Sequence, residues 1–479
     1  MEAAETEAGR QHPVVTLAVL SIAGLSFALL QSMVAPALPD IQHTLGTSEG
    51  TVAWILTAYL LSASVATPII GRLGDVHGKE KSMLVVLVVL AVGTLISALA
   101  TSIGTMILGR VIQGAGGGIF PLAFGIIRDE FPAERVAGSI GLMSAILGVG
   151  GGLGIVLAGP ITDSLSYHWL FWLPLTTVLL SVVLTYFFVP ESPIKAPGRV
   201  NWTAAGLLST GLAALLLAIS ETTSWGWGSP KTIGLITVGL VVLTAWVGVE
   251  FRARYPLVDM NVMRSRPVWT TDLVAFLLGA GMYSTFIVLP QFVETPSSSG
   301  FGFDASVTGA GFFMVPCTIA MLLVGPLAGP LRARVGSRLP LIVGCGFAAL
   351  GFAMLAVAHT RPIEVYVAAG LLGIGIGLAF AAMANLIVEA VPPDQTGVAT
   401  GVNTITRTVG GAFGGQIVAM IIAGGGSPTE GSFTLAFAVI AGSLVLSILA
   451  GLAIPRPGRE PATRGRLRHQ IAATSGRAT

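Results

Sequence analysis

The chain consists mostly of apolar runs about 20 residues long, separated by short polar breaks. Hydrophobic residues make up 53% of its 479 residues, whereas charged residues make up only 10%. A run of about 20 apolar residues is long enough to cross the hydrocarbon core of a bilayer as an α-helix. Inside lipid the backbone must satisfy its own hydrogen bonds, which only helices and closed barrels achieve. The sequence therefore predicts an all-α integral membrane protein.

The runs number about fourteen and are grouped as six, two and six. They lie near residues 14–38, 51–71, 82–101, 105–127, 136–160, 169–189, 203–220, 232–252, 268–292, 305–331, 339–358, 363–388, 398–423 and 433–454. A polar break rich in proline follows the sixth run. We therefore predict an N-terminal six-helix bundle (1–189), a linker with two inserted transmembrane helices and a basic cytoplasmic loop (190–267), a C-terminal six-helix bundle (268–455), and a disordered cytoplasmic tail (456–479).

The chain also contains an internal repeat. At an offset of 260 residues, an acidic loop and the glycine-rich helix after it occur twice. The matched pairs are Asp129 and Glu389, Pro132 and Pro392, Glu134 and Asp394, Gly141 and Gly401, Val149 and Val409, Gly150 and Gly410, Gly151 and Gly411, and Gly154 and Gly414. A second pair of loops, at 71–78 and 329–336, matches at an offset of 258. Repeated halves in an apolar chain are typical of secondary transporters, whose substrate site lies between the halves.

The positive charges are distributed unevenly between the two sides of the membrane. If the N-terminus is cytoplasmic, outer segments contain only Lys231 and Arg361, while Arg110 and Arg407 fall within apolar runs. All other Lys and Arg then lie in inner segments. Short cytoplasmic loops carry such an excess of positive charge. We therefore predict a multi-pass protein of the cell membrane (inner or plasma membrane) with both termini in the cytoplasm.

The loop after the second run reads GRLGDVHGKEK and spans residues 71–81. Its glycines allow a tight turn and close helix approach, while Asp75 can accept hydrogen bonds from a helix N-terminus or pair with an arginine. This loop resembles the signature of the major facilitator superfamily, Gly-x-Leu-x-Asp-x-x-Gly followed by basic residues. The two repeated halves are similar to those of the same family. The alternative is that the loop only forms a cytoplasmic turn.

The resemblance implies that this loop is a conformational latch, in which an aspartate belongs to a charge relay that holds the outward-facing state. The expected latch residues are Gly71, Gly74, Asp75, Gly78, Lys79 and Arg128, with Arg128 as the partner of Asp75. The second copy of the loop has Ala333 in place of the acid, so the latch should be one-sided.

The fourth run begins with the sequence GRVIQGAGGG at 109–118. An arginine inside a membrane helix is costly and normally faces a polar interior. Arg110, followed by Gln113, resembles the fourth-helix motif of the family, in which the arginine is linked to proton coupling. Alternatively, Arg110 extends its side chain to the nearby outer interface.

The fifth run is rich in glycine and ends in a Gly-Pro pair. Glycines at helical spacing leave a helix face without side chains, which allows close packing on a neighbour. The run resembles the antiporter motif of drug exporters, so Gly150, Gly154, Gly159 and Pro160 are expected to form the antiporter-motif helix. With about fourteen helices, the chain most resembles the fourteen-helix drug:proton antiporter branch.

Proton coupling needs a group that changes its protonation state while it faces the cavity. The branch commonly has an aspartate in the first helix ahead of Ala-Leu-Pro, but this chain has Leu29, Leu30 and Gln31 there. The proton-coupling candidates that remain are Asp272, Arg110, Asp163 and Glu389. Asp272 is the preferred candidate, and the alternative is an interfacial carboxylate near Arg266 that stays charged.

Several polar and aromatic residues are candidates for the substrate cavity: Gln31, Trp54, Tyr59, Gln113, Phe120, Asn385, Asn403 and Arg407. Asn403 and Arg407 are four residues apart and therefore lie on one helix face. They could reach the cavity or bond a neighbouring helix. The aromatic residues could contact a lipophilic substrate or only pack against lipid and protein.

The resemblance implies an exporter of amphipathic or antibiotic-like molecules, driven by the proton gradient and working by alternating access. It implies no cofactor and no metal, and its expected partners are the lipid bilayer, protons and a small amphipathic substrate, not nucleic acid. The fold resembles proteins that work as monomers. One alternative is a proton symporter or facilitator that takes up a specific molecule. Another is a membrane receptor or enzyme, which would need a catalytic cluster or a large soluble domain, and the sequence shows neither. The sequence also lacks a GxxxxGK nucleotide loop, which argues against ATP-driven transport by this chain alone.

Overall fold

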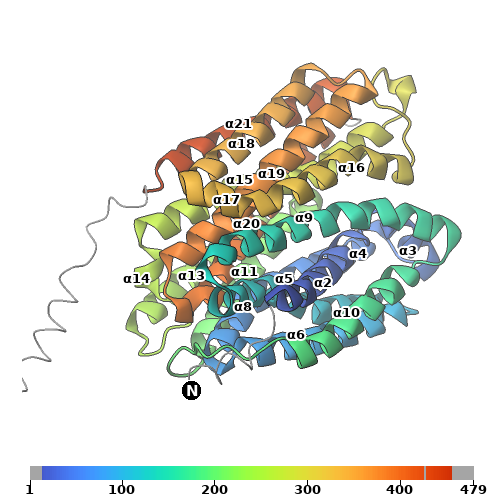
Figure 1. The fold of residues 1–479 in the computed structure, drawn as a ribbon. Helices are drawn as coiled ribbons and strands as arrows, with labels where there is room; N and C mark the ends of the chain where they lie inside the picture. The colour runs from blue at the N-terminus through green and yellow to red at the C-terminus, as the bar shows by residue number, and fades with distance from the viewer. Residues whose placement is uncertain (1–12, 425–427, 456–479) are drawn as a thin grey trace, which may run out of the picture.

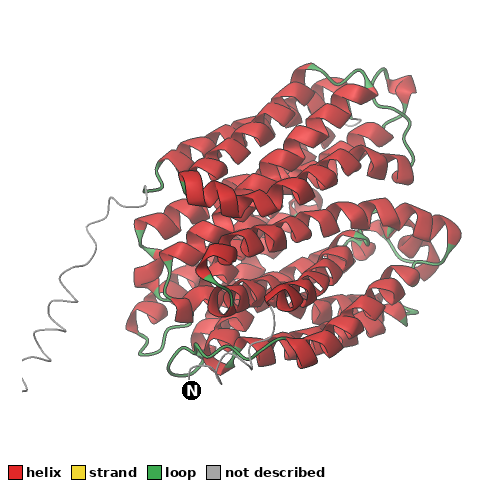
Figure 2. Cartoon of the chain, viewed as in Figure 1, coloured by secondary structure: helices red, strands yellow, loops and turns green. Residues whose placement is uncertain are grey.

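The computed structural model describes residues 13–424 and 428–455 of the chain (Figure 1). In these residues the regular structure is entirely helical (Figure 2). Within the described ranges, fourteen helices are long and apolar enough to cross a membrane. The predicted fold class, an all-α membrane protein with about fourteen spanning helices, is confirmed.

The helices of the N-terminal bundle cross the membrane six times. They are α2 (Pro13–Ser32), α5 (Trp54–His77), α6 (Lys79–Ala98), α7 (Ile103–Gln113) continued through η1 (Gly114–Gly118) by α8 (Ile119–Glu130), α9 (Ala133–Ser164) and α10 (Trp169–Phe188). Two short helices, α3 (Leu38–Leu45) and α4 (Glu49–Val52), connect α2 to α5. The first span therefore ends at Ser32 rather than near residue 38 as predicted, and a separate helix begins at Leu38, with Pro39 in its first turn.

The inserted pair and the C-terminal bundle provide the other eight spans. The inserted pair is α11 (Trp202–Ser220) and α13 (Pro230–Arg252). The short helix α12 (Thr222–Trp225) follows α11, and α14 (Met260–Met263) follows α13. The C-terminal bundle contains α15 (Arg266–Glu294), η2 (Ser297–Ser299), α16 (Val307–Val324), η3 (Gly325–Leu327), α17 (Ala328–Val335), α18 (Arg338–Val357), α19 (Pro362–Ala390), η4 (Pro393–Gln395), α20 (Thr396–Ala423) and α21 (Glu430–Leu452).

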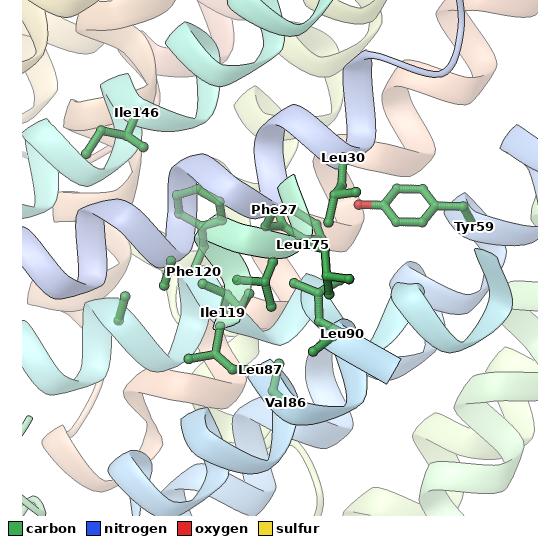
Figure 3. Close-up of a cluster of buried hydrophobic side chains, with 14 of the residues drawn as sticks. Phe27, Leu30, Tyr59, Val86, Leu87, Leu90, Ile119, Phe120, Ile146 and Leu175 are labelled. Carbon is green, nitrogen blue, oxygen red and sulfur yellow. The ribbon is translucent and has the colours of Figure 1, made fainter. Parts of the chain in front are cut away.

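The two bundles lie side by side, with α9 of one and α20 of the other at their boundary (Figure 1). Each bundle has its own hydrophobic core. In the N-terminal core, Phe27, Ile119 and Phe120 pack among leucines of α6 and α10, and Tyr59 projects from α5 toward Leu30 (Figure 3). The inserted pair forms a third cluster with α5 and α20, beside the boundary of the bundles.

Glycine sets the shape of the fourth span. Four of the five η1 residues are glycines, and three of them approach α5 closely. A Cβ at Gly114, Gly117 or Gly118 would collide with Ser62, Thr67 or Ile70, respectively. The absent side chains therefore let the fourth span pack directly on α5.

The two sides of the protein are named here from the charge distribution. The inner side is the one with the turn at Gly78 between α5 and α6, the loop at 131–132 and the linker at 189–201, and the outer side is the one with α3, α4 and α12. The segment at 71–81, predicted as a loop, is helical except at Gly78, because α5 continues to His77 and α6 begins at Lys79. The spans alternate between these sides along the chain.

Candidate functional site

A cavity of 460 Å³ lies between the bundles on the outer side. It is lined from one bundle by α2, α5 and α9 and from the other by α15. Its side chains are mainly apolar or aromatic and include Tyr59, Leu147, Ile155, Met282, Tyr283, Phe286 and Ile287. It extends to Gln291 and Glu294, which are exposed at the outer end of α15. This outer cavity has the size and the apolar lining that are typical of sites for small organic molecules.

Two smaller spaces continue the outer cavity toward the inner side. The first, of 40 Å³, shares Gln31, Leu60, Leu147 and Tyr283 with the outer cavity. The second, of 10 Å³, shares Leu147 and Arg407 with the first. We call these two spaces together the cavity floor. Side chains fill most of this region, so the route through the protein narrows before the inner side.

The inner side is closed by contacts between α5 and α20. The Asp75 carboxylate accepts hydrogen bonds from the backbone N–H groups of Gly397 (3.1 Å) and Val398 (2.9 Å), at the start of α20. A helix N-terminus stabilises a negative charge, so the carboxylate binds the end of α20. A Cβ at Gly71 would collide with the carbonyl of Gly397. The expected latch aspartate thus joins the two bundles directly.

Arg128 also joins the two bundles, but it forms no ion pair with Asp75. Its guanidinium donates hydrogen bonds to the carbonyl oxygens of Val391 (2.8 Å) and Pro392 (3.2 Å) and to the hydroxyl of Thr396 (2.7 Å). Arg128, the predicted partner of Asp75, therefore interacts with it electrostatically but forms no direct ion pair with it. Arg128 lies at the end of α8, where its side chain reaches the loop before α20 instead of the α5 carboxylate.

Lys79 is the cation that pairs with Asp75. Its ammonium group lies 3.7 Å from Asp75 Oδ1 and 2.7 Å from Asp129 Oδ2, and all three side chains are fully buried. Ser192 also donates a hydrogen bond to Asp129. This cluster ties α5, α6, α8 and the linker together just beneath the contact with α20.

The second copy of the loop has a related arrangement. Ser337, which matches Lys79 at the offset of 258, donates a hydrogen bond to Glu389 (2.9 Å), which matches Asp129. Arg332 forms an ion pair with the same carboxylate. Glu389 therefore lies at the inner loops with a fixed basic partner and outside the lining of the outer cavity and its floor.

Arg110 is fully buried, so its side chain does not extend to the interface. Its guanidinium donates hydrogen bonds to the carbonyls of Leu30 (3.0 Å) and Ile55 (3.2 Å) and to the Gln113 side chain (2.6 Å). It also lies 4.0 Å from the centroid of the Tyr59 ring, which separates it from the outer cavity. Arg110 thus connects α2, α5 and α7 without a carboxylate partner among the described residues.

Replacing Arg110 with lysine is expected to lower the thermal stability of the purified protein. A lysine has one nitrogen and cannot reach all three acceptors, and each lost hydrogen bond to a charged group costs about 1.5–3 kcal/mol. The midpoint of thermal unfolding should fall clearly below that of the wild type. Arg334→Lys, at an exposed residue of α17, is the matched control and should leave the midpoint unchanged. Equal midpoints for Arg110→Lys and the wild type would contradict this account.

The glycines of α9 bring that helix against both bundles. A Cβ at Gly150 would collide with Ala28 and one at Gly154 with Ser32, both in α2, whereas one at Gly159 would collide with Thr308 of α16. Pro160 lies within α9 near its outer end and is exposed. The expected antiporter-motif helix is therefore the one that packs closely across the boundary of the bundles.

The acidic candidates for proton coupling have different surroundings. Asp272 accepts a hydrogen bond from Asn403 (2.7 Å), and Asn403 lines the cavity floor. Arg266 donates instead to the carbonyl of Ala453, so it does not hold Asp272 in an ion pair. Asp163 is exposed at the outer end of α9. Of these acids, only Asp272 is linked by hydrogen bonding to the cavity.

The structure divides the expected cavity residues into two groups. Gln31, Tyr59, Phe120, Asn403 and Arg407 line the outer cavity or its floor. The other three, Trp54, Gln113 and Asn385, do not line these spaces. Gln113 holds Arg110, and Asn385 donates a hydrogen bond across the boundary to the carbonyl of Ala137 (3.2 Å).

Comparison with known proteins agrees with this architecture. The family model described as Major Facilitator Superfamily matches residues 20–415, which is most of the chain. The protein belongs to the major facilitator superfamily. The resemblance inferred from the loop at 71–81 is thus confirmed, and the protein is a transporter rather than an enzyme.

Individual members of the superfamily are also similar to this chain. Multidrug resistance protein 3 of Bacillus subtilis is 27% identical over 81% of this chain and 76% of its own length. The cephamycin export protein CmcT of Amycolatopsis lactamdurans is 30% identical over 83% of each chain. Among solved structures, the human organic anion transporter MFSD10 (TETRAN) has the same fold, with a TM-score of 0.67 and 16% identity, over 92% of this chain and all of that one.

Several residues of this major facilitator site are not among those predicted from the sequence. Tyr283 and Phe286 line the cavity from α15, and the ring of Phe380 packs against the guanidinium of Arg407. Helices that are apolar on every face give no periodicity that would select the cavity-facing residues. Asp129 was missed as the partner of Lys79, although its recurrence as Glu389 was a usable signal.

Proposed function

We propose that this protein exports amphipathic, antibiotic-like small molecules across the cell membrane in exchange for protons. The observation that carries the proposal is the apolar outer cavity between two repeated bundles, closed on the inner side by the Asp75 contact. The names of its relatives, multidrug resistance and cephamycin export proteins, support export as the direction of transport. The charge distribution supports cytoplasmic termini, and we propose that the protein works as a monomer.

In this proposal the two bundles rock about the cavity and expose it to each side in turn. The inner closure by α5 and α20 is suited to such a cycle because its polar contacts are hydrogen bonds to backbone groups. The helices α5 and α20 approach closely at Gly71 and Gly397, and the hydrogen bonds to Asp75 join them. Arg128 binds carbonyls just before α20. Backbone partners at a helix end can be exchanged for water when the bundles separate.

Asp272 is the proposed proton carrier, and Asp272→Asn should remove gradient-driven export. The substitution keeps the size of the side chain and its capacity to bond Asn403, but it removes the group that changes charge. We expect the rate of dye export driven by a pH gradient to fall at least tenfold. Dye movement down its own concentration gradient should be retained.

The measurement is fluorescent-dye transport in proteoliposomes with an imposed pH gradient and a protonophore control. Asp163→Asn, which changes an exposed aspartate, is the matched control and should transport at the wild-type rate. Loss of transport in both variants, or in neither, would remove Asp272 as the carrier. If no lipophilic dye moves with the gradient in the wild type, the multidrug proposal itself fails.

A proton symporter or facilitator for one compound is the second candidate function. The observation that favours it is Gln31, an uncharged residue of the cavity lining. In the antiporter branch this part of the first helix commonly carries an aspartate. In the same proteoliposomes, movement of the compound in the same direction as the protons would support this candidate over export.

A further inference from the structure

Arg407 lies at the cavity floor and lines both of its spaces. Only 8% of its surface is exposed, and its Nε has no hydrogen-bond partner. It forms no ion pair with any acidic side chain in the described residues. Its guanidinium carbon lies 4.4 Å from the centroid of the Phe380 ring, and the side chain of Tyr283 is also close to it. A buried arginine without an acidic partner is costly. Unlike Arg110, which bonds two backbone carbonyls and Gln113, Arg407 faces the cavity floor with its Nε unpaired and can therefore bind an anionic group there.

The surroundings of Arg407 do not neutralise its charge. The residues that line the two floor spaces include no aspartate or glutamate. Asp272 bonds Asn403, one helical turn away along α20, and has no contact with Arg407. A cation–π contact stabilises a guanidinium but leaves its positive charge in place. The cavity floor is therefore a positively charged end in a site of low dielectric constant.

The second buried arginine adds to the same field. Arg110 lies behind Tyr59, whose ring lines the outer cavity, and its oxygen partners are uncharged. Among the described residues that line the outer cavity, Glu294 is the one acid, and it is exposed at the outer end, where solvent screens its charge. The electrostatic potential should therefore become more positive from the outer end of the cavity to its floor.

We propose that the site takes amphipathic substrates that carry a carboxylate or a similar anionic group, with this group bound to Arg407. This inference deepens the proposed export function by naming its substrate class. The apolar part of the molecule would lie in the 460 Å³ outer cavity, between Ile155 and Phe286. The floor space of 40 Å³ has room for a small polar group, since about 10–15 Å³ of such space is enough to hold one water molecule. A guanidinium presents paired donors that match a carboxylate.

Binding to the purified protein tests this inference without requiring transport. The probes are 11-(dansylamino)undecanoic acid and its methyl ester, which share one fluorescent, apolar body and differ in charge. We expect the wild type to bind the acid at least tenfold more tightly than the ester. Arg407→Gln should weaken binding of the acid at least tenfold and change binding of the ester less than twofold. Arg407→Lys should retain part of the preference for the acid, because it keeps the charge.

Arg334→Gln is the matched control, since Arg334 is exposed on the inner side and far from this lining. Equal affinity of the wild type for acid and ester would overturn the inference, and that comparison needs no variant. If a folded Arg407→Gln protein loses affinity for the acid and for the ester to the same extent, the inference is also overturned. Charge-selective binding without gradient-driven transport would instead refute only the export function, whereas gradient-driven export of cationic dyes without acid binding would refute only the anionic substrate class.

Discussion

Replacing Lys79 with methionine is expected to destabilise the protein more than any other single change in the inner region. The lysine is fully buried between two buried carboxylates, at 2.7 Å from Asp129 and 3.7 Å from Asp75. Removing one partner of a buried ion pair costs about 3–5 kcal/mol, because the remaining charge is left without compensation. Here two carboxylates would lose their shared cation. The yield of monodisperse protein and the midpoint of thermal unfolding should both fall sharply.

Two further variants show whether charge is the cause. Lys81→Met, two residues along the same helix, changes an exposed lysine and should behave like the wild type. Adding Asp129→Asn to Lys79→Met removes one of the uncompensated carboxylates, so it should recover part of the lost stability. Wild-type stability in Lys79→Met would show that the buried cluster does not depend on the lysine.

Replacing Gly71 with leucine is expected to stop the inner side from closing. The position of its Cβ is already occupied by the backbone carbonyl of Gly397 in the opposite bundle. A backbone atom cannot move aside as a flexible side chain can, so α5 and α20 must separate. Separation also breaks the hydrogen bonds from Gly397 and Val398 to Asp75. On the proposed cycle, transport should fall at least tenfold.

Labelling from outside measures this change directly. A cysteine in place of Gln291, at the outer end of the cavity, should react with a membrane-impermeant maleimide in the parent protein. The two native cysteines, Cys317 and Cys345, are buried and should not contribute. Adding Gly71→Leu should slow the reaction, because the outer side closes when the inner side opens. Gly346→Leu, at a glycine with open space around it, should leave the labelling rate unchanged. Unchanged labelling and transport in Gly71→Leu would contradict the role of this contact.

The features that the sequence predicted correctly are those that depend on local composition. The fourteen spans follow from the length and apolar character of each run, because lipid leaves the backbone no other partners. The close approach at Gly71 and Gly154 follows from absent side chains. The repeat places Asp129 and Glu389 at equivalent positions, and these two acids bond the equivalent residues Lys79 and Ser337.

The sequence did not determine which buried charges meet. Arg128 was assigned to Asp75, yet it bonds the carbonyls before α20, while Lys79 neutralises the acid. Nothing near Arg110 in the chain showed that Leu30 and Ile55 would accept its hydrogen bonds. Such partners lie on other helices, and their direction depends on how each helix is rotated against its neighbours.

The sequence by itself thus determined that the chain is a membrane transporter of two repeated bundles, since apolar runs, charge distribution and the loop at 71–81 are local properties. Only the tertiary structure decided that Arg407 lies at the cavity floor without an acid and that Asp272 bonds Asn403. When a span is apolar on nearly every side, its sequence carries little information about how the helix is rotated about its own axis. Packing between helices far apart in the chain therefore decides which polar side chains face the cavity.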